Sequence, residues 1–377
     1  MGSSGGTGAP TLHDVAREAG VSLATASRVL NGSARVVAEA YRERVTLAAD
    51  QLGYTTNLSA QAVAKGTSSI VSLVVPDIAD PYFSQIAAGV TAEAEAAGLV
   101  VSVSVTGRDA ERELQVIRTL RGQRPRVLIL AGSRRTEDPM QDALAAELES
   151  YTRLGGTVAV IGSNDLGYAT ARVDNRAAAR ELALHVAGLG YRRVAAVVGP
   201  QVLVTSADRL GGFQDGLAEH GAAIADEHVI VSDFSRDGGY DGMQRLLAAG
   251  IDGAAGIELV FAASDVMAMG VMSALRDAGI EPGTGIAVCG FDDIPTVRDV
   301  TPALTTVRIP LERLGRTALR LALGDDSATA SSETPSPAPA TLDATSAPAT
   351  TPADQASDIA SLDAEVVLRA STPPLSR

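Results

Sequence analysis

Residues 11–32 read TLHDVAREAGVSLATASRVLNG, and this stretch predicts two short helices that meet at a glycine turn. Thr11 is of a residue type that caps helix N-termini, and apolar residues recur at helical spacing over residues 12–19. Gly20 can adopt the left-handed conformation that ends a helix, and Ser22 can cap a second helix over residues 23–30. Two short helices joined by so tight a turn form a helix-turn-helix unit.

The second helix is predicted to turn one face inward and the other outward. The inward residues are Ala26, Val29 and Leu30, and the outward residues are Leu23, Ala24, Ser27 and Arg28. In a helix-turn-helix unit the second helix enters the major groove of DNA. An arginine on its outer face can bind guanine through a fork of two N–H groups, or hold a phosphate. The alternative is a small helical bundle without a ligand, but a separate three-helix unit of this size favours DNA binding.

A third helix is predicted over residues 38–52, with Gly53 as its end. Its inward residues are predicted to be Val45, Leu47, Ala48 and Leu52. Residues 58–66 (LSAQAVAKG) are weakly amphipathic and too few to hold a helix alone in water. Such a segment is helical only when something docks against it. We therefore expect a disordered start at 1–10, a DNA-binding domain at 11–55 and a hinge helix at 56–66.

Charge is divided unevenly along the chain. The 377 residues carry a formal net charge of −14, yet residues 1–66 hold six basic and five acidic side chains and so have a balance of +1. The remainder carries −15. An acidic body repels the phosphate backbone, so non-specific DNA binding is expected to be weak and sensitive to salt.

Composition also limits cofactors and location. Cys289 is the one cysteine, which excludes an internal disulfide and a thiolate metal cluster. The four histidines lack ligand spacing, so we expect neither a metal nor a cofactor. The sequence has no run of eighteen apolar residues and does not start with a signal peptide, so we expect a cytoplasmic protein without a membrane partner.

From residue 69 onward, apolar runs alternate with helical patterns. Strands are predicted at 70–75, 100–105, 127–131, 158–161, 194–198, 229–231, 257–261 and 286–291, and a first helix at 81–97. Strands that alternate with helices indicate parallel sheets covered on both faces. Because the strands are too many for one comfortable sheet, we predict an α/β fold of two doubly wound parallel-sheet lobes. Ligands of such sheets bind beyond the carboxyl ends of the strands, here in a cleft between the lobes.

The lobes are predicted to share the chain discontinuously. We expect residues 67–167 and 303–323, including a helix at 311–323, in the N-terminal lobe, and residues 168–302 and 363–373 in the C-terminal lobe. Residues 325–361 are mostly Ala, Ser, Thr and Pro and predict a disordered insert. Residues 364–370 predict one more strand.

Four separated motifs resemble those of one known family. They are the stretch at 11–32, LGYTTN at 52–57, VVPDIADPYF at 74–83, and GFDD at 290–293 with TPALTTVRIPLERLG at 301–315. Their order and spacing resemble the lactose/galactose-repressor (LacI/GalR) family of bacterial transcription regulators. The lobes are then similar to periplasmic sugar-binding proteins, used as a sensor.

This resemblance implies a homodimer that binds palindromic operator DNA. Leu23 and Ala24 match base-reading positions and can contact thymine methyl groups. Val63 matches a leucine of the hinge helix that wedges between base pairs in the minor groove. Valine is shorter than leucine, which puts the depth of the DNA kink in doubt. The full set of expected DNA-binding residues is Thr11, Ser22, Leu23, Ala24, Thr25, Ser27, Arg28, Asn31, Asn57, Ala60 and Val63.

Polar residues at strand ends predict an effector site in both lobes. In the N-terminal lobe, Asp80, Tyr82 and Phe83 offer a carboxylate and two rings, a combination that suits a sugar. In the C-terminal lobe, Arg209 matches the effector arginine of the family and Asp292 an acceptor carboxylate. The other candidates are Asn164, Asp174, Phe234, Ser264, Asp265 and Arg308. Ser264 stands where the family usually has an asparagine, which removes an amide that can hold a sugar hydroxyl.

Plainer structural roles compete with these assignments. Tyr82 and Phe83 can be core residues and Asp80 a helix cap, while Arg209 can form a surface ion pair and Asp292 a turn. The acceptors, arginine and rings together favour a neutral polyol over a nucleobase.

The sequence contains no catalytic motif that we recognise. Residues 188–190 lack the third glycine of a phosphate-binding loop, and no nucleophile–base set sits at strand ends, so we do not expect an enzyme. We predict a transcriptional repressor that a sugar effector releases from its operator. The alternatives are a corepressor-dependent regulator that senses a purine or sugar phosphate, and a sugar-binding protein without a DNA role.

Overall fold

The computed structural model describes residues 10–30, 37–55, 68–163, 166–253, 256–325 and 358–375. The chain divides into two compact units, Met1–Ser68 and Ser69–Arg377, and each has an apolar core of its own. Within the described ranges, no helix is both long and apolar enough to cross a membrane.

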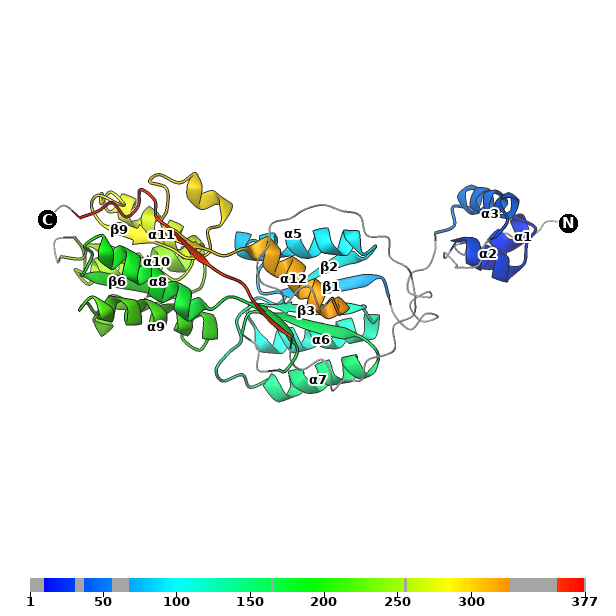
Figure 1. The fold of residues 1–377 in the computed structure, drawn as a ribbon, viewed down its shortest axis with the longest axis horizontal. Coiled ribbons are helices and arrows are strands. Elements are labelled where there is room, and N and C mark those ends of the chain that lie inside the picture. Colours follow the sequence, from blue (N-terminus) through cyan, green and yellow to red (C-terminus); the bar gives the residue numbers. More distant parts are fainter. Residues whose placement is uncertain are drawn as a thin grey trace. The chain divides into compact units, whose positions relative to one another are not determined.

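The first unit is built from three helices: α1 (Leu12–Glu18), α2 (Leu23–Leu30) and α3 (Glu39–Leu52) (Figure 1). Thr11 and Asp14 cap α1 reciprocally, since the Asp14 N–H donates to Thr11 Oγ1 at 3.4 Å and the Thr11 N–H donates to the Asp14 carboxylate at 3.0 Å. The Thr25 N–H donates to Ser22 Oγ at 3.1 Å and so caps α2. The helix starts therefore follow the predicted capping chemistry.

One predicted core residue of this unit lies outside. Leu47 is 59% exposed, whereas Val45, Ala48 and Ala49 are buried. Two residues along a helix turn the side chain through about 200°, so Leu47 and Val45 occupy opposite faces of α3. The prediction that Leu47 faces inward was wrong.

The second unit contains two α/β lobes, the larger of which holds a six-stranded parallel sheet in the order β11-β5-β4-β3-β1-β2. Helices α5 and α12 cover one face and α6 and α7 the other (Figure 1). Successive residues of β1 face opposite sides, so Leu73 joins one apolar cluster and Val74 the other. The strands are β1 (Ile70–Val75), β2 (Val100–Val105), β3 (Val127–Ala131), β4 (Thr157–Ile161), β5 (Ala169–Arg172) and β11 (Ile359–Ser361). The helices are α5 (Pro81–Ala96), α6 (Ala110–Gln123), α7 (Gln141–Arg153) and α12 (Leu311–Leu323).

The second lobe has a four-stranded parallel sheet in the order β7-β6-β8-β9. Helices α8 and α9 pack together, as do α10 and α11. The strands are β6 (Val194–Val198), β7 (Val229–Val231), β8 (Leu259–Ala262) and β9 (Ala287–Cys289). The helices are α8 (Asn175–Gly188), α9 (Val204–Glu219), α10 (Arg236–Ala248) and α11 (Asp265–Asp277), with short 3₁₀ turns at Asp226–His228 and Pro295–Arg298.

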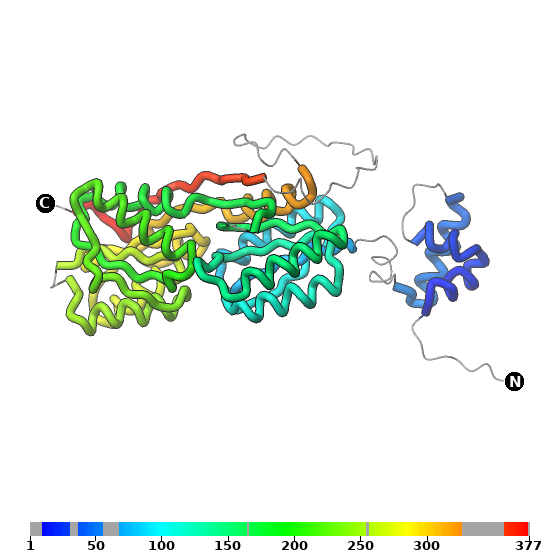
Figure 2. Tube along the Cα trace, turned by 90° about the horizontal axis from the view of Figure 1, so that it is seen from below, coloured from blue at the N-terminus to red at the C-terminus, as the bar shows by residue number. Residues whose placement is uncertain are grey.

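The chain passes between the lobes after β5, through β10 (Thr306–Arg308), and between β11 and β12 (Glu365–Val367). Strands β10 and β12 pair in antiparallel fashion, so two of these connections lie side by side (Figures 1 and 2). These two connections therefore hydrogen-bond to each other where the chain passes between the lobes.

The structure corrects two predicted boundaries. Strand β5 belongs to the larger sheet, although the C-terminal lobe was predicted to start at residue 168. Strand β11 pairs with β5, although residues 359–361 were assigned to the disordered insert. Both strands are only three or four residues long, and their place is set by pairing with distant neighbours. Residues 326–357 of the predicted insert lie outside the described residues.

Candidate effector pocket and DNA-reading helix

Helix α2 presents the outward face that the sequence predicted. Leu23 is 39% exposed, and Ala24 and Arg28 are exposed as well. Ser27 is half-buried. Ala26 is fully buried against α1 and α3. The exposed face combines an apolar group, which suits a thymine methyl, with a guanidinium, which suits guanine or phosphate.

Three other predicted DNA-contact residues take part in capping. Thr11 and Ser22 cap α1 and α2, and Thr25 Oγ1 lies 2.8 Å from Ser22 Oγ. Their hydroxyl groups sit at helix N-termini, where backbone N–H groups can also receive a phosphate. The predicted contacts Asn31, Asn57, Ala60 and Val63, and with them the hinge helix at 56–66, lie outside the described residues.

A pocket lies between the two lobes of the second unit, with about 1120 Å³ of space that includes its open mouth. Both lobes contribute side chains to its wall, and most of them follow the carboxyl ends of strands, as ligand sites in parallel sheets do. Six of the predicted effector residues line it: Asp80, Tyr82, Phe83, Arg209, Phe234 and Asp292.

The N-terminal wall is formed where β1 leads into α5. Asp80 accepts a hydrogen bond from the Tyr82 N–H at 3.0 Å and thereby caps α5. Burial raises the pKa of the Asp80 carboxyl, although Arg108, 3.9 Å away, opposes the shift. The rings of Tyr82 and Phe83 meet edge to face with centroids 4.9 Å apart. Asp80 is thus both a helix cap and a pocket carboxyl, beside rings on which a sugar can stack.

The C-terminal wall is organised by Arg209 of α9, whose side chain is only 2% exposed. Its guanidinium donates to Asn175 Oδ1 at 2.9 Å, to the Ala263 carbonyl at 2.7 Å and to Asp292 Oδ1 at 2.8 Å. It also stacks on the ring of Phe291, 4.0 Å from the centroid. The predicted arginine therefore lies at the pocket in a buried ion pair, which fixes its orientation.

Asp292 has an unusual backbone conformation. Its φ of 122° lies in a region that L-residues rarely adopt and that costs of order 1–3 kcal/mol. Burial raises the pKa of Asp292 well above its usual range, while the neighbouring Arg209 favours the charged form. Backbone strain and a perturbed carboxyl at one residue of a pocket are typical of a functional site.

The sequence reasoning missed the basic residues of the N-terminal wall. Arg108 follows β2, and Arg134 and Arg135 follow β3, and all three line the pocket. Arg134 forms a two-bond fork with Glu113 at 2.6 and 3.2 Å. The strand-end rule that selected Asp80 applies equally to these loops, so their position after predicted strands was the available signal.

Backbone hydrogen bonds cross the pocket mouth from one lobe to the other. The Val204 N–H donates to the Arg134 carbonyl at 3.0 Å, and the Thr136 N–H donates to the Val202 carbonyl at 2.9 Å. The loop after β3 and the loop before α9 thus pair like two short antiparallel strands. The lobes are in contact at this edge, which closes the pocket on one side.

Two family models match the chain, one described as bacterial regulatory proteins, lacI family, over residues 11–57, and one as a periplasmic binding protein-like domain over residues 183–341. The HTH-type transcriptional regulator GalS of Salmonella typhimurium is 34% identical over 315 residues, which are 83% of this chain and 89% of that protein. The chain belongs to the lacI family of bacterial regulatory proteins.

Solved structures of lacI-family proteins share the fold. The Lac repressor bound to ONPG in its repressed state matches with a TM-score of 0.75 at 25% identity, over 96% of this chain and 99% of that chain. The transcriptional regulator CelR in complex with cellobiose matches with a TM-score of 0.63 at 27% identity, over 96% and 99% of the two chains. The predicted family, the predicted α/β fold with a helix-turn-helix head, and the function as a transcriptional regulator with an effector-binding domain are confirmed.

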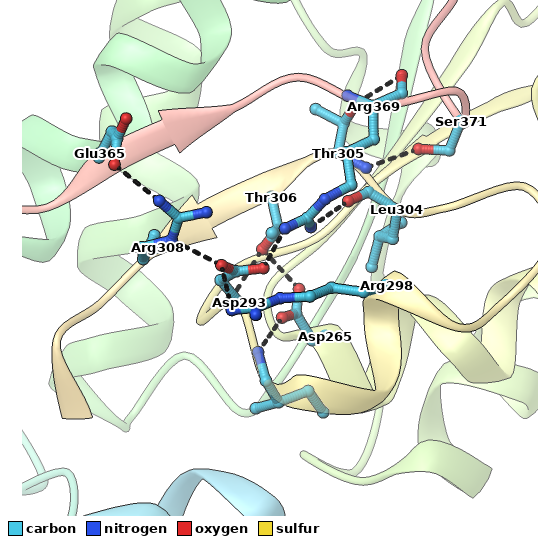
Figure 3. A network of polar contacts seen from close by, with 11 residues as sticks. Asp265, Asp293, Arg298, Leu304, Thr305, Thr306, Arg308, Glu365, Arg369 and Ser371 are labelled. Carbon is cyan, nitrogen blue, oxygen red and sulfur yellow. Dashed lines mark hydrogen bonds and ion pairs between the residues drawn. The ribbon is translucent and has the colours of Figure 1, made fainter. Parts of the chain in front are cut away.

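Within this lacI-family fold, four predicted effector residues do not line the pocket. Asp174 caps α8, where it accepts from the Ala177 N–H at 2.9 Å, and the next residue, Asn175, reaches the pocket instead. Ser264 caps α11 and is buried. Asp265 and Arg308 belong to a polar network behind the pocket wall (Figure 3). The predicted position of these four on the pocket is corrected, and Asn164 lies outside the described residues.

The network behind the wall is centred on Asp293, whose side chain is fully buried. Three guanidinium groups surround its carboxylate, from Arg369 at 2.6 Å, Arg308 at 2.7 Å and Arg298 at 3.2 Å (Figure 3). Because Arg308 and Arg369 follow or form the two connecting strands β10 and β12, this carboxylate ties both connections to the C-terminal lobe. Arg308 also pairs with Glu365 of β12 at 3.0 Å. These residues hold the connections between the lobes.

Asp265 occupies a neighbouring buried position. Its carboxylate accepts from the Thr306 hydroxyl at 2.6 Å and from the Ile294 N–H at 2.9 Å. Burial raises its pKa to about 7, against these hydrogen bonds. It therefore fastens β10 and the turn after Asp293 to the start of α11.

Proposed function

We propose that this lacI-family regulator is a homodimeric repressor that binds palindromic operator DNA and is released when a sugar enters the pocket. The observation that carries the proposal is the pocket itself. Its walls come from both lobes and include hydrogen-bond acceptors (Asp80 and Asp292), an arginine and aromatic rings. A ligand that touches both walls binds the closed arrangement better than an open one and so shifts the population toward it.

The size of the expected shift follows from the ligand's preference. A hundredfold preference for the closed lobes corresponds to about 2.7 kcal/mol. A corepressor would bind in the same pocket but would prefer the operator-bound form of the protein, and so would raise operator affinity. The direction in which ligand changes operator affinity therefore distinguishes repressor release from corepression.

A dimer is supported by the edge of the larger sheet. Strand β2 ends that sheet and leaves Val100 and Val103 62% and 42% exposed. An apolar edge strand of this kind is a surface that a second copy can cover. We further propose a cytoplasmic location, where operator DNA is accessible, and no catalytic role.

The test begins with the DNA. Operator duplexes are selected from a random pool with purified protein, and binding is followed by fluorescence anisotropy with and without a panel of mono- and disaccharides. We expect saturable binding of a palindromic duplex and its loss on addition of one sugar. Binding of all duplexes with equal affinity would overturn the DNA-binding proposal.

Variants separate the two ligands. Arg28→Ala is expected to weaken operator binding without changing the affinity of the lobes for sugar. Phe234→Ala is expected to remove the effect of the sugar on operator affinity and to leave operator binding without sugar intact, since Phe234 lines the pocket and its replacement leaves no charged group unpaired. Arg209→Ala should have the same effect on the response, at the cost of stability, because it leaves Asp292 buried without its cation. A normal sugar response in both pocket variants would show that the effector binds elsewhere.

A further inference from the structure

Arg135 lines the pocket, and its side chain is half-buried. Its Nε is buried and has no hydrogen-bond partner among the described residues, and the side chain forms no ion pair there. A buried donor that is left unpaired is unfavourable, and more so on a charged group. A half-buried cation that lines a ligand pocket and has a buried, unpaired N–H can accept an anionic group of the ligand as its partner.

The other guanidinium groups of the pocket are already engaged. Arg209 is bonded to Asp292. The Nε of Arg134 also has no partner among the described residues, but its two terminal nitrogens bond both carboxylate oxygens of Glu113. Arg108 has a looser partner in Asp80, 3.9 Å away. Arg172 also forms no ion pair in the described chain, but it is exposed to water, which satisfies its donors. Arg135 is thus a half-buried cation of this wall that forms no ion pair with the described residues.

Two further carboxylates of the pocket, Asp109 and Asp138, are hydrogen-bonded to backbone N–H groups. Asp109 accepts from the Arg112 N–H at 2.8 Å and caps α6, and Asp138 accepts from the Met140 N–H at 2.9 Å. Neither forms an ion pair with Arg135. A ligand anion placed at Arg135 therefore meets carboxylates whose charge is partly offset by backbone donors.

The position of Arg135 also couples its occupancy to lobe closure. Its backbone forms a β-bridge to Leu203 of the other lobe, between the two hydrogen bonds that cross the pocket mouth. An acceptor bound to the guanidinium would therefore hold a loop whose backbone pairs with the opposite lobe in this structure.

We propose that the effector carries an anionic group, a carboxylate or a phosphate, which Arg135 binds through its guanidinium fork. This rests on the proposed function and names the chemical class of its effector: a sugar whose ring packs against Tyr82 and Phe234 and whose anionic group is directed to the loop after β3. Arginine matches the planar geometry of both anions.

The test compares anionic and neutral probes on the full-length protein. Thermal unfolding and titration calorimetry are run with inorganic phosphate, glucose 6-phosphate, gluconate and glucose, at ionic strength matched with chloride. We expect a saturable rise in Tm with at least one anionic probe that exceeds the rise with glucose. The phosphate and gluconate arms distinguish the two anions.

Substitutions at single arginines test whether Arg135 is responsible for anion binding. Arg135→Gln is expected to weaken binding of the anionic probe at least tenfold, and Arg135→Lys, which keeps the charge but not the fork, to weaken it less. Arg153→Gln removes an equal charge from an exposed position at the end of α7 and should bind as the unchanged protein does. Circular dichroism confirms that each variant is folded.

Two outcomes overturn the proposal: no anionic probe exceeds glucose and the chloride control, or Arg135→Gln binds the anion as tightly as the unchanged protein. If glucose raises Tm equally in both proteins and releases operator DNA, the proposed function stands and the anionic effector does not. If no duplex is selected, the proposed function itself fails, whatever the probes do.

Discussion

The pKa values of two adjacent carboxyl groups, Asp292 and Asp293, are shifted in opposite directions. Their φ angles of 122° and 55° turn one side chain to Arg209 at the pocket and the other to the strands that connect the lobes. Burial raises the pKa of Asp292. At Asp293 burial acts in the same direction, but hydrogen bonds from Arg308 and Arg369 outweigh it and lower the pKa. One turn of backbone thus joins the effector pocket to the connections between the lobes.

The raised pKa of Asp265 predicts how stability depends on pH. The folded protein keeps a proton up to about pH 7 that the unfolded chain releases near pH 4. Stability should therefore fall between about pH 4 and pH 7, by up to about 1.4 kcal/mol per pH unit from this group, and level off above. Asp265→Asn removes the contribution of this carboxyl to the pH dependence of the free energy of unfolding. Urea unfolding at pH 5, 6 and 7 should give a shallower slope for the variant.

The matched control for that experiment is Asp237→Asn. Asp237 is 84% exposed and pairs with Arg236 on the surface, so its replacement should leave the slope unchanged. If Asp265→Asn keeps the slope of the unchanged protein, the Asp265 carboxyl is ionised when folded and the predicted shift is wrong.

At the scale of helices and strands, the sequence predicts what local pattern determines. Helices α2 and α12 have the predicted bounds, because their apolar periodicity lies within the segment and a flanking residue, Ser22 before α2 and Gly324 after α12, marks one end. Strands β5 and β11 are too short to carry such a pattern, and only pairing across the sheet places them. The site divides similarly. Asp80 and Asp292, which follow predicted strands, reached the pocket. Asp265 and Arg308 satisfy the same strand-end rule but turn behind the pocket wall.

The packing of α5 on α12 depends on glycine. A Cβ at Gly89 would overlap the carbonyl oxygen of Glu312, and one at Gly315 would overlap that of Ile86. Gly89→Ala should therefore push the helices apart and lower the free energy of unfolding by about 1–3 kcal/mol.

At a second helical glycine, substitution by alanine is expected to raise stability instead of lowering it. A Cβ at Gly122 of α6 has nothing within 4 Å, so Gly122→Ala should stabilise by up to about 1 kcal/mol through helix propensity alone. Urea unfolding of both variants tests the pair. Equal effects at the two positions would contradict the close approach of α5 and α12.

At the scale of the whole molecule, regulation requires that the pocket communicate with operator binding. The lobes are joined by paired connecting strands, by the arginines around Asp293 and by hydrogen bonds across the pocket mouth. These contacts favour discrete relative positions of the lobes over continuous deformation. A ligand that selects one of those positions can then change operator affinity without contacting the DNA.

Such coupling is reciprocal, and this gives the last prediction. If the effector lowers operator affinity by some factor, the operator must lower effector affinity by the same factor. We expect about 10-fold to 100-fold, within the usual range of coupling energies of about 1–3 kcal/mol. The ligand that releases the duplex in the anisotropy screen is titrated by calorimetry with and without saturating duplex. Arg28→Ala weakens operator binding, so the same duplex concentration should no longer saturate it, and its effector affinity should be the same with and without duplex. Equal affinities in the unchanged protein would contradict the coupling, because a release that leaves no trace on effector binding violates linkage.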